Sequence, residues 1–362
     1  MSEHIEETQS ETLSYSSISE IRNALMRNAN NPRELYRYIQ DNYNRWIAES
    51  DKPEDEKTIE LIRGSEIDFH NLTVEFSRQD CEPFAASIAL IGVETYPMST
   101  DLIADLIKYS QEIGDIEMCQ YGIEKLNTID RKYWTWRTFV FVIDYLKDSM
   151  GSVKSIDTYL TNIEEAKKLI EDFKKYIPHE ERAYVAEAEL HQNQNEYQDA
   201  LSALLNGVKN VAVAPQCCMK LADYYLELGE YDEAEKFARK GLLTSVQDQP
   251  TVSVGYLYYI LALSLDAKRI IARQAGKIMD SSEITDILTA YQTADRLLIN
   301  EGRTSVSYRK TIEARKIMLE MEEGLSEESS ISEPEKEKAI EKLSKIANML
   351  SLRDVMENKT QS

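Results

Sequence analysis

The sequence predicts an all-α protein made of stacked antiparallel helix hairpins, an α-solenoid. Ala166, Ala200 and Ala234 lie 34 residues apart, and residues 193–208 align without a gap on residues 227–242. Helix breakers are scarce, with 12 glycines and 8 prolines in 362 residues. No segment combines the alternating pattern of a strand with a hairpin-turn signal. A fixed period of this length is typical of a helical repeat array.

Charge and apolar patterning exclude several classes of protein. The net charge is −22, which disfavours binding to phosphate backbones and to anionic membrane surfaces. The N-terminal segment lacks the basic start and apolar stretch of a signal peptide. The longest apolar runs, 84–93 and 256–265, suit buried helices and are too short to span a membrane. The four cysteines form no CxxC pair, so we expect reduced thiols and a cytoplasmic location.

Capping residues place the first helices. Residues 1–16 are acidic and polar and are predicted to be disordered. A helix is expected over Ser17–Asn28, with Ser17 near its N-cap. Asn31 caps the next helix and Pro32 occupies its first turn. Further helices are expected at about 54–63, 66–79, 82–95 and 99–112.

The middle of the chain contains a degenerate repeat and an aromatic stretch. Gly114 is expected to close one helix, and a repeat at about 100–131 places Cys119 where the later repeats have alanine. Residues 132–149 and 155–177 form the next helix pair. Helix spacing within 131–141 predicts that Tyr133 and Trp136 are buried and that Trp134 is the exposed aromatic residue.

The C-terminal half continues the array. Its segments are repeats at 147–180, 181–214 and 215–248, an extended hairpin at 250–302, a helix at 303–323, a Ser/Glu-rich linker at 324–335 and a capping helix with a tail at 336–362.

The repeats at 181–248 resemble the tetratricopeptide family. Ala188 and Ala222 stand where two helices of one hairpin touch in that family, and Ala200 and Ala234 stand between hairpins. Gly229 suits the left-handed residue that ends the first helix, and Asn195 takes this place one repeat earlier. The resemblance implies one TPR-like solenoid over residues 17–323 with a right-handed superhelix.

The resemblance also places a partner-binding groove on the inner face of each first helix. Family members that grip the acidic C-termini of chaperones have Lys, Arg and Asn there, whereas this chain has mainly acidic and apolar groups. We therefore expect a basic or apolar peptide or helix as the partner. The residues implied for the groove are Arg182, Val185, Glu189, Gln192, Asn193, Gln216, Met219, Asp223, Leu226 and Glu227.

One stretch opposes the overall charge. The segment from Asp266 to Lys316 contains ten basic residues and seven acidic ones. This stretch is either ordinary helix surface or a docking patch for an acidic partner, a nucleic acid or the acidic tail of the chain itself. The candidate patch consists of Lys268, Arg269, Arg273, Lys277, Arg309, Lys310, Arg315 and Lys316.

Motifs that carry chemistry are absent from the sequence. It has no HExxH zinc motif, no phosphate-binding GxxxxGK[ST] and no GxSxG. His191 is expected to be a packing residue. We therefore expect no enzyme activity, no metal and no cofactor.

The sequence thus favours a non-catalytic scaffold or adaptor that binds a peptide or helical segment of another protein. One alternative is a regulatory sensor that binds a small signal or peptide and acts in trans, since no helix-turn-helix DNA-binding domain is evident in residues 17–95. A further alternative is nucleic-acid binding through 266–316, helped by the aromatic and basic residues of 131–141.

Overall fold

The structure is a computed structural model, and it describes most of the chain. The described residues are 15–28, 30–49, 52, 61–152, 156–245, 252–277, 280–299 and 305–326. The predicted C-terminal helix, most of the predicted linker and nearly all of the predicted disordered N-terminus therefore lie outside the described residues.

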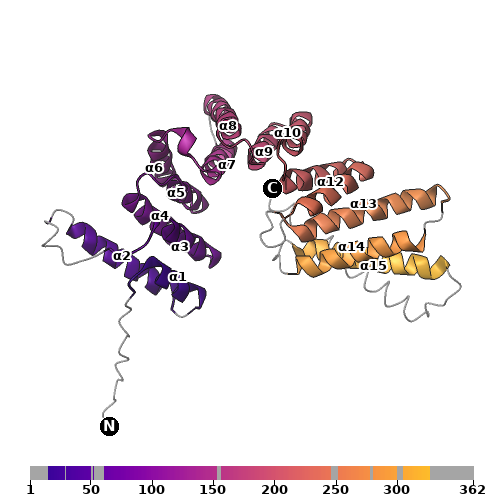
Figure 1. Ribbon diagram of the computed structural model, residues 1–362, viewed down its shortest axis with the longest axis horizontal. Coiled ribbons are helices and arrows are strands. Elements are labelled where there is room, and N and C mark those ends of the chain that lie inside the picture. The colour runs from indigo at the N-terminus through magenta and orange to yellow at the C-terminus, as the bar shows by residue number, and fades with distance from the viewer. Residues whose placement is uncertain are drawn as a thin grey trace, which may run out of the picture. The chain divides into compact units, whose positions relative to one another are not determined.

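The chain divides into two compact units, residues 1–186 and 187–362, and the boundary falls within helix α9. Successive helices in each unit form antiparallel hairpins (Figure 1). The first unit contains α1 (Ile18–Met26), α2 (Pro32–Ala48), α3 (Glu66–Arg78), α4 (Glu82–Thr95), α5 (Thr100–Glu112), α6 (Ile116–Asn127), the 3₁₀ turn η2 (Arg131–Tyr133), α7 (Trp136–Ser152), α8 (Ile156–Tyr176) and the start of α9 (Arg182–Asn193).

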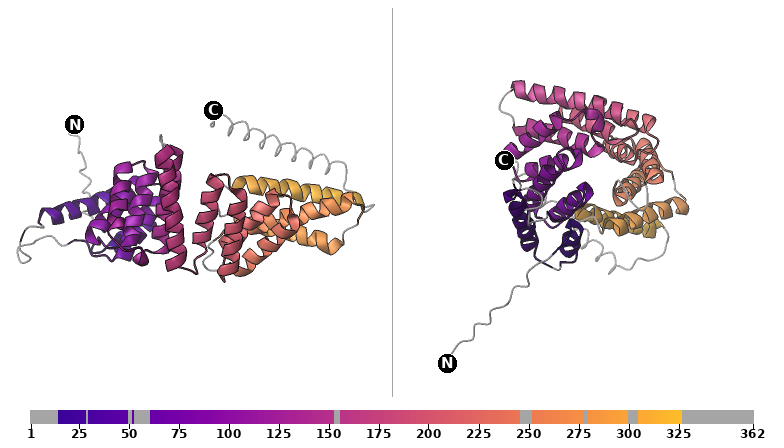
Figure 2. Two further views of the ribbon diagram at one scale, coloured as in Figure 1. Left: turned by 90° about the horizontal axis from the view of Figure 1, so that it is seen from above. Right: turned by 60° about the vertical axis from the view of Figure 1, so that its left-hand side comes forward.

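The second unit continues from α9 with longer helices toward its end (Figure 2). It contains α10 (Tyr197–Asn210), α11 (Pro215–Glu227), α12 (Tyr231–Thr244), α13 (Val254–Gln274), α14 (Ser281–Leu298) and α15 (Ser305–Ser326). The all-α helical-repeat fold predicted from the sequence is confirmed.

Side-chain caps start several helices where the sequence places them. The Ser17 side chain accepts a hydrogen bond from the amide of Glu20 at the start of α1. Asn31 caps α2 in the same way, with Pro32 as its first residue. Ser65 and Asp68 form a reciprocal capping box at α3. Each such contact satisfies a helix amide that has no partner within the helix.

Small residues and left-handed turns make the hairpins of the second unit compact. Ala200, Ala222 and Ala234 are fully buried. Gly229 has a φ of 76° and Asn195 a φ of 61°, so both adopt the left-handed conformation expected at the helix ends. The fixed spacing of the sequence thus corresponds to hairpins of similar build, α9/α10 and α11/α12.

Two expectations about the first unit are wrong. Residues 61–63 are not helical, because Arg63 and Ser17 form an isolated parallel bridge between extended segments. The expected helix from residue 132 begins instead at Trp136, after the turn η2. The hairpin of α7 and α8 therefore begins at Trp136, whereas the predicted repeat begins at residue 147.

Among the described helices, none is both long and apolar enough to cross a membrane.

Candidate functional site

The two predicted groove residues of the first unit have packing roles. The Arg182 guanidinium lies 3.9 Å from the centre of the Trp136 ring and forms an ion pair of 2.8 Å with Glu180. Val185 is buried. At this end of α9, Arg182 packs against Trp136 of α7. Val185 belongs to the core and does not line an open surface.

The next predicted groove residues lie on the second half of α9. Gln192 is half-buried and Asn193 is exposed. The Glu189 carboxylate forms an ion pair of 2.9 Å with Lys220 of α11. Lys220 was not singled out from the sequence, and its position 31 residues after Glu189 is the signal that could have found it. This acidic group thus joins two neighbouring helices.

The predicted groove residues of α11 form one stripe. Each of them lies three or four residues from another member of the set, so they share a face of the helix. Most are half-buried and Glu227 is exposed. These residues are Gln216, Met219, Asp223, Leu226 and Glu227.

Tyrosines of α13 and α15 extend this stripe. The Tyr256 hydroxyl donates a hydrogen bond of 2.6 Å to Asp223. Its ring centre lies 5.0 Å from that of Tyr308, and Tyr259 and Tyr308 are 5.1 Å apart. Burial, followed by the hydrogen bond to Asp223, raises the pKa of Tyr256, so its hydroxyl keeps its proton and remains a donor. Sequence reasoning missed these tyrosines, because the family pattern gives no role to them.

The predicted basic patch is largely neutralised by neighbouring acids. Lys268 of α13 forms ion pairs with Asp232 at 2.5 Å and with Glu235 at 2.9 Å. Arg309 of α15 pairs with Asp295 of α14 at 2.7 Å. These cations fix contacts between helices of the second unit.

Two further members of that patch surround a buried carboxylate. Asp266 is nearly inaccessible to solvent, and its oxygens lie 3.1 Å from Arg269 Nε and 2.6 Å from Arg315 Nη2. The Tyr291 hydroxyl donates a third hydrogen bond of 3.0 Å to it. A buried charge requires such compensation. Arg269 and Arg315 are therefore structural and do not form an open anion-binding site.

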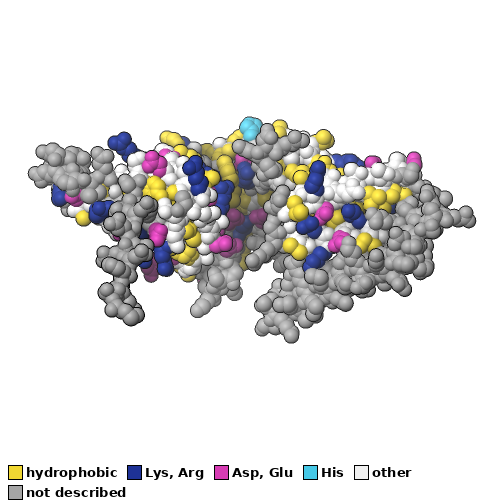
Figure 3. Space-filling view, turned by 90° about the horizontal axis from the view of Figure 1, so that it is seen from below, with side chains coloured by type: hydrophobic (Ala, Val, Ile, Leu, Met, Phe, Trp, Pro, Cys, Tyr) yellow, Lys and Arg dark blue, Asp and Glu magenta, His cyan; other side chains and the backbone are white. Residues whose placement is uncertain are grey.

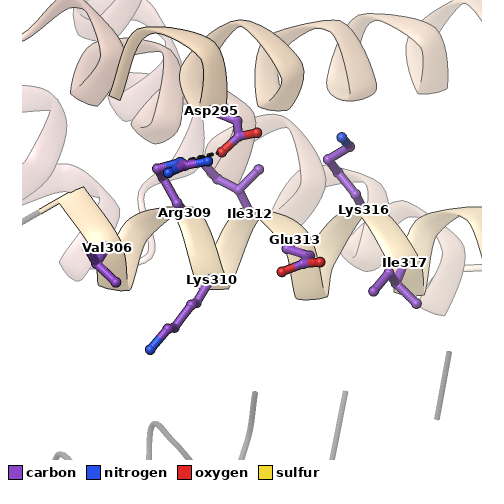
Figure 4. A pocket seen from close by; sticks show the side chains of 8 residues that line it. All are labelled: Asp295, Val306, Arg309, Lys310, Ile312, Glu313, Lys316 and Ile317. Atoms are coloured by element: carbon purple, nitrogen blue, oxygen red, sulfur yellow. Dashed lines mark hydrogen bonds and ion pairs between the residues drawn. The ribbon is translucent and has the colours of Figure 1, made fainter. Parts of the chain in front are cut away.

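The remaining lysines of α15 do not converge. A pocket of about 500 Å³ lies along α15 and includes Asp295 of α14, and Figure 4 shows Lys310 and Lys316 pointing away from each other. Arg273 and Lys277 are exposed near the end of α13. On the face in Figure 3, the basic side chains that are drawn alternate with acidic ones. The structure thus shows no concentrated basic surface among these described residues.

A different feature of the first unit is an apolar cleft between α6, α7 and α8. It consists of two adjoining cavities of about 420 and 350 Å³ that share Tyr145 and Leu146 of α7. Residues of α6 form one wall and residues of α8 the other. The apolar lining consists of Ile116, Cys119, Ile123, Leu126, Trp134, Val142, Tyr145, Leu146 and Leu169.

Both ends of the cleft are polar. At one end Asp148 accepts a hydrogen bond of 2.6 Å from Gln111, and a third cavity beside them contains Glu112 and Asp144. At the other end Arg131 is held between Glu165 and Asp172. The Cys119 thiol backs the middle of the cleft, and burial raises its pKa to about 11, so it is protonated and unreactive near neutral pH.

A buried polar network joins α3, α5 and α7 in the same unit. His70 Nδ1 lies 2.6 Å from Asp105, and Arg137 donates to His70 Nε2 at 2.5 Å and to Asp105 at 2.9 Å. Because a guanidinium only donates, His70 Nε2 accepts and its Nδ1 carries the proton toward Asp105. These three side chains tie α3, α5 and α7 together. The network's one signal in the sequence is the spacing of His70, Asp105 and Arg137, which are about one repeat apart.

The aromatic prediction for residues 131–141 is reversed. Trp134 is 5% exposed, and its indole nitrogen donates to the backbone oxygen of Ile129. Tyr133 is 65% exposed, and Trp136 is half-buried under Arg182. The turn η2 interrupts the helix, so helix spacing does not apply before Trp136. These rings are not arranged as an open series for stacking bases.

His191 is half-buried and not a core residue. Its Nδ1 lies 2.7 Å from Glu196, and Asp199 is close enough to complete a group of three potential metal ligands. The two carboxylates are exposed at the turn between α9 and α10. Such surface groups commonly pair without a metal.

The comparisons with known proteins concern the fold. No protein-family model and no curated protein sequence matches the chain. The hairpins described above show an all-α helical-repeat fold. Solved structures with similarity include a TPR protein of Thermus thermophilus, at 14% identity and a TM-score of 0.41 over 57% of this chain and 99% of that one.

Two further similar structures have comparable values. One is a tetratricopeptide repeat protein of Parabacteroides merdae, at 12% identity and a TM-score of 0.42, covering 81% of this chain and 99% of that one. The other is a human IFIT1 dimer with PPP-AAAA, at 13% identity and a TM-score of 0.37, covering 85% of this chain and 71% of that one.

Proposed function

We propose that this TPR-like protein is a non-catalytic interaction module, and that the inner face of α11, α13 and α15 binds a basic or apolar segment of another protein. The observation that carries the proposal is the stripe of α11 beside the tyrosines. It combines half-buried apolar side chains with the Asp223 and Glu227 carboxylates. Tyrosine and methionine are enriched at protein interfaces.

Asp223 is suited to recognise a cation. One of its oxygens is held by the Tyr256 hydroxyl, which fixes the carboxylate, while a carboxylate can accept several hydrogen bonds. Tyr256 and Tyr308 present aromatic rings beside it, and aromatic faces attract lysine and arginine side chains. A peptide with alternating basic and apolar residues matches this surface better than an acidic one does.

Fluorescence anisotropy with synthetic peptides tests the proposal. We expect peptides of Lys, Arg, Leu and Phe to bind in a salt-sensitive way, and the same peptides with Glu in place of Lys and Arg to bind poorly. The Asp223→Lys protein should bind the basic peptides about tenfold more weakly, because the rim carboxylate becomes repulsive. Asp286→Lys, the same charge change at an exposed site on α14, is the control. Equal affinity of the Asp223→Lys and Asp286→Lys proteins for the basic peptides would contradict binding at this face.

Nucleic-acid binding through the basic stretch is less well supported than peptide binding. Lys268, Arg269, Arg309 and Arg315 all form ion pairs within the second unit. Phosphate contacts require cations that can release their counterions to solvent. Cations already paired with carboxylates gain less from a phosphate.

A further inference from the structure

We propose that the apolar cleft between α6, α7 and α8 is a second interaction surface, which receives a basic amphipathic helix of a partner protein. The cleft belongs to the first unit and shares no residue with the face of α11, α13 and α15. Each proposal can therefore be tested independently of the other.

The connection between α6 and α7 borders the cleft. Residues 128–135 include the turn η2 and the buried Trp134, which packs against Phe139 with ring centres 5.2 Å apart. By contrast, α4 and α5 are joined only by residues 96–99 and pack closely along each other. Beside the turn η2, Cys119, Leu126 and Val142 are buried deep in the cleft, and its open side is formed by Ile116, Tyr145 and Leu146.

The uncovered surface is apolar in its middle. Ile116 at the start of α6 is 64% exposed, and Tyr145 and Leu146 of α7 are half-buried at the floor. Burying such side chains against a partner is favourable by about 25 cal/mol per Å² of apolar surface. A contiguous apolar patch that is rimmed by polar residues is typical of an interaction site.

The rim selects the charge of the occupant. Glu112, Asp144 and Asp148 lie at one end, where Lys108 is 3.9 Å from Glu112 and Lys147 pairs with Asp144. At the other end the two carboxylates of Glu165 and Asp172 outnumber the single cation of Arg131. The rim therefore carries a net negative charge, which favours lysine or arginine on the occupant.

The length of the cleft matches helix periodicity. Its floor runs along α7 from Val142 to Asp148, a distance of about 9 Å at 1.5 Å per residue. Apolar residues at positions i, i+3 or i+4, and i+7 of a docked helix cover a similar distance. Such a helix would lie between α6 and α8 and cover α7, as helices cover one another elsewhere in the fold.

Binding of three matched synthetic peptides tests this inference. The first is an amphipathic helical peptide with Leu on one face and Lys at the flanks. The second replaces each Lys with Glu, and the third carries a central Pro that prevents a continuous helix. We expect only the first to bind, with fluorescence anisotropy as the measure, and its binding should protect the amides of α6 and α8 from hydrogen exchange.

Two variants locate the binding. Ile116→Asp places a charge on the exposed apolar wall, and Asp148→Lys reverses the charge at the rim. Each should weaken the first peptide at least about tenfold, while Glu171→Lys on the exposed side of α8 should leave it unchanged. Circular dichroism checks that all three variants stay folded. Absence of binding, equal binding of the acidic peptide, or indifference to both cleft variants would overturn the proposal. Equal binding of the proline peptide would show that an extended segment is the occupant, and not a helix.

Discussion

The Tyr256 hydroxyl donates a hydrogen bond of 2.6 Å to the Asp223 carboxylate and so ties α13 to α11 across 33 residues. Several other polar ties between the described helices also span about one repeat, because equivalent positions of neighbouring hairpins lie side by side. Further examples are Glu189–Lys220, Glu235–Lys268 and Asp101–Thr135.

Tyr256→Phe should lower the free energy of unfolding by about 1 kcal/mol, since one charge-assisted hydrogen bond is lost while the ring packing with Tyr308 remains. Urea denaturation monitored by circular dichroism measures the change. Tyr133→Phe, at an exposed tyrosine of η2, is the matched control and should be neutral. A loss of the same size in both variants would show that the contact with Asp223 does not stabilise the fold.

Arg137→Met should destabilise the first unit by about 3 kcal/mol. The substitution removes the cation that compensates Asp105, whose side chain is fully buried. Thermal unfolding and denaturant titration give the size of the effect.

The double variant Arg137→Met with Asp105→Leu tests the cause of that loss. Removing both charges should recover a substantial part of the stability, because the cost arises from the carboxylate left alone. A double variant as unstable as the sum of the two single variants would contradict this account of the network with His70.

Asp68 should make the first unit sensitive to acid. Hydrogen bonds from the Ser19 hydroxyl and from the backbone and hydroxyl of Ser65 hold the pKa of Asp68 below its usual value. A lowered folded-state pKa contributes stability above the unfolded value of about 3.9, and this contribution disappears as the pH falls through the folded value. Asp68→Asn should therefore be less stable than the wild type near pH 6, and the difference should shrink toward pH 3.

Denaturant unfolding at several pH values measures this difference. Asp157→Asn is a suitable control, because Asp157 is an exposed residue in the first turn of α8. A gap between wild type and Asp68→Asn that stays constant from pH 6 to about pH 3 would show that ionisation of Asp68 does not stabilise the cap.

Local signals in the sequence were sufficient to predict most of the helices and their repeat. Ser17 and Asn31 cap helices because their side chains reach amides only two or three residues away. Gly229 and Asn195 close helices because their own backbone tolerates the left-handed conformation. Such interactions join residues within one helical turn of each other, so the local sequence is enough to predict them.

Tertiary structure decided which side chains are available to a partner. Asp223 and Glu189 were expected in an open groove, but their partners, Tyr256 and Lys220, come from the next hairpin and depend on the register between helices. Trp134 is buried beside the turn η2, where it lines the cleft next to α7. The sequence by itself determined where most helices begin and end and that they repeat. Burial and pairing across hairpins depend on connection geometry, which acts over about one repeat and leaves no local pattern.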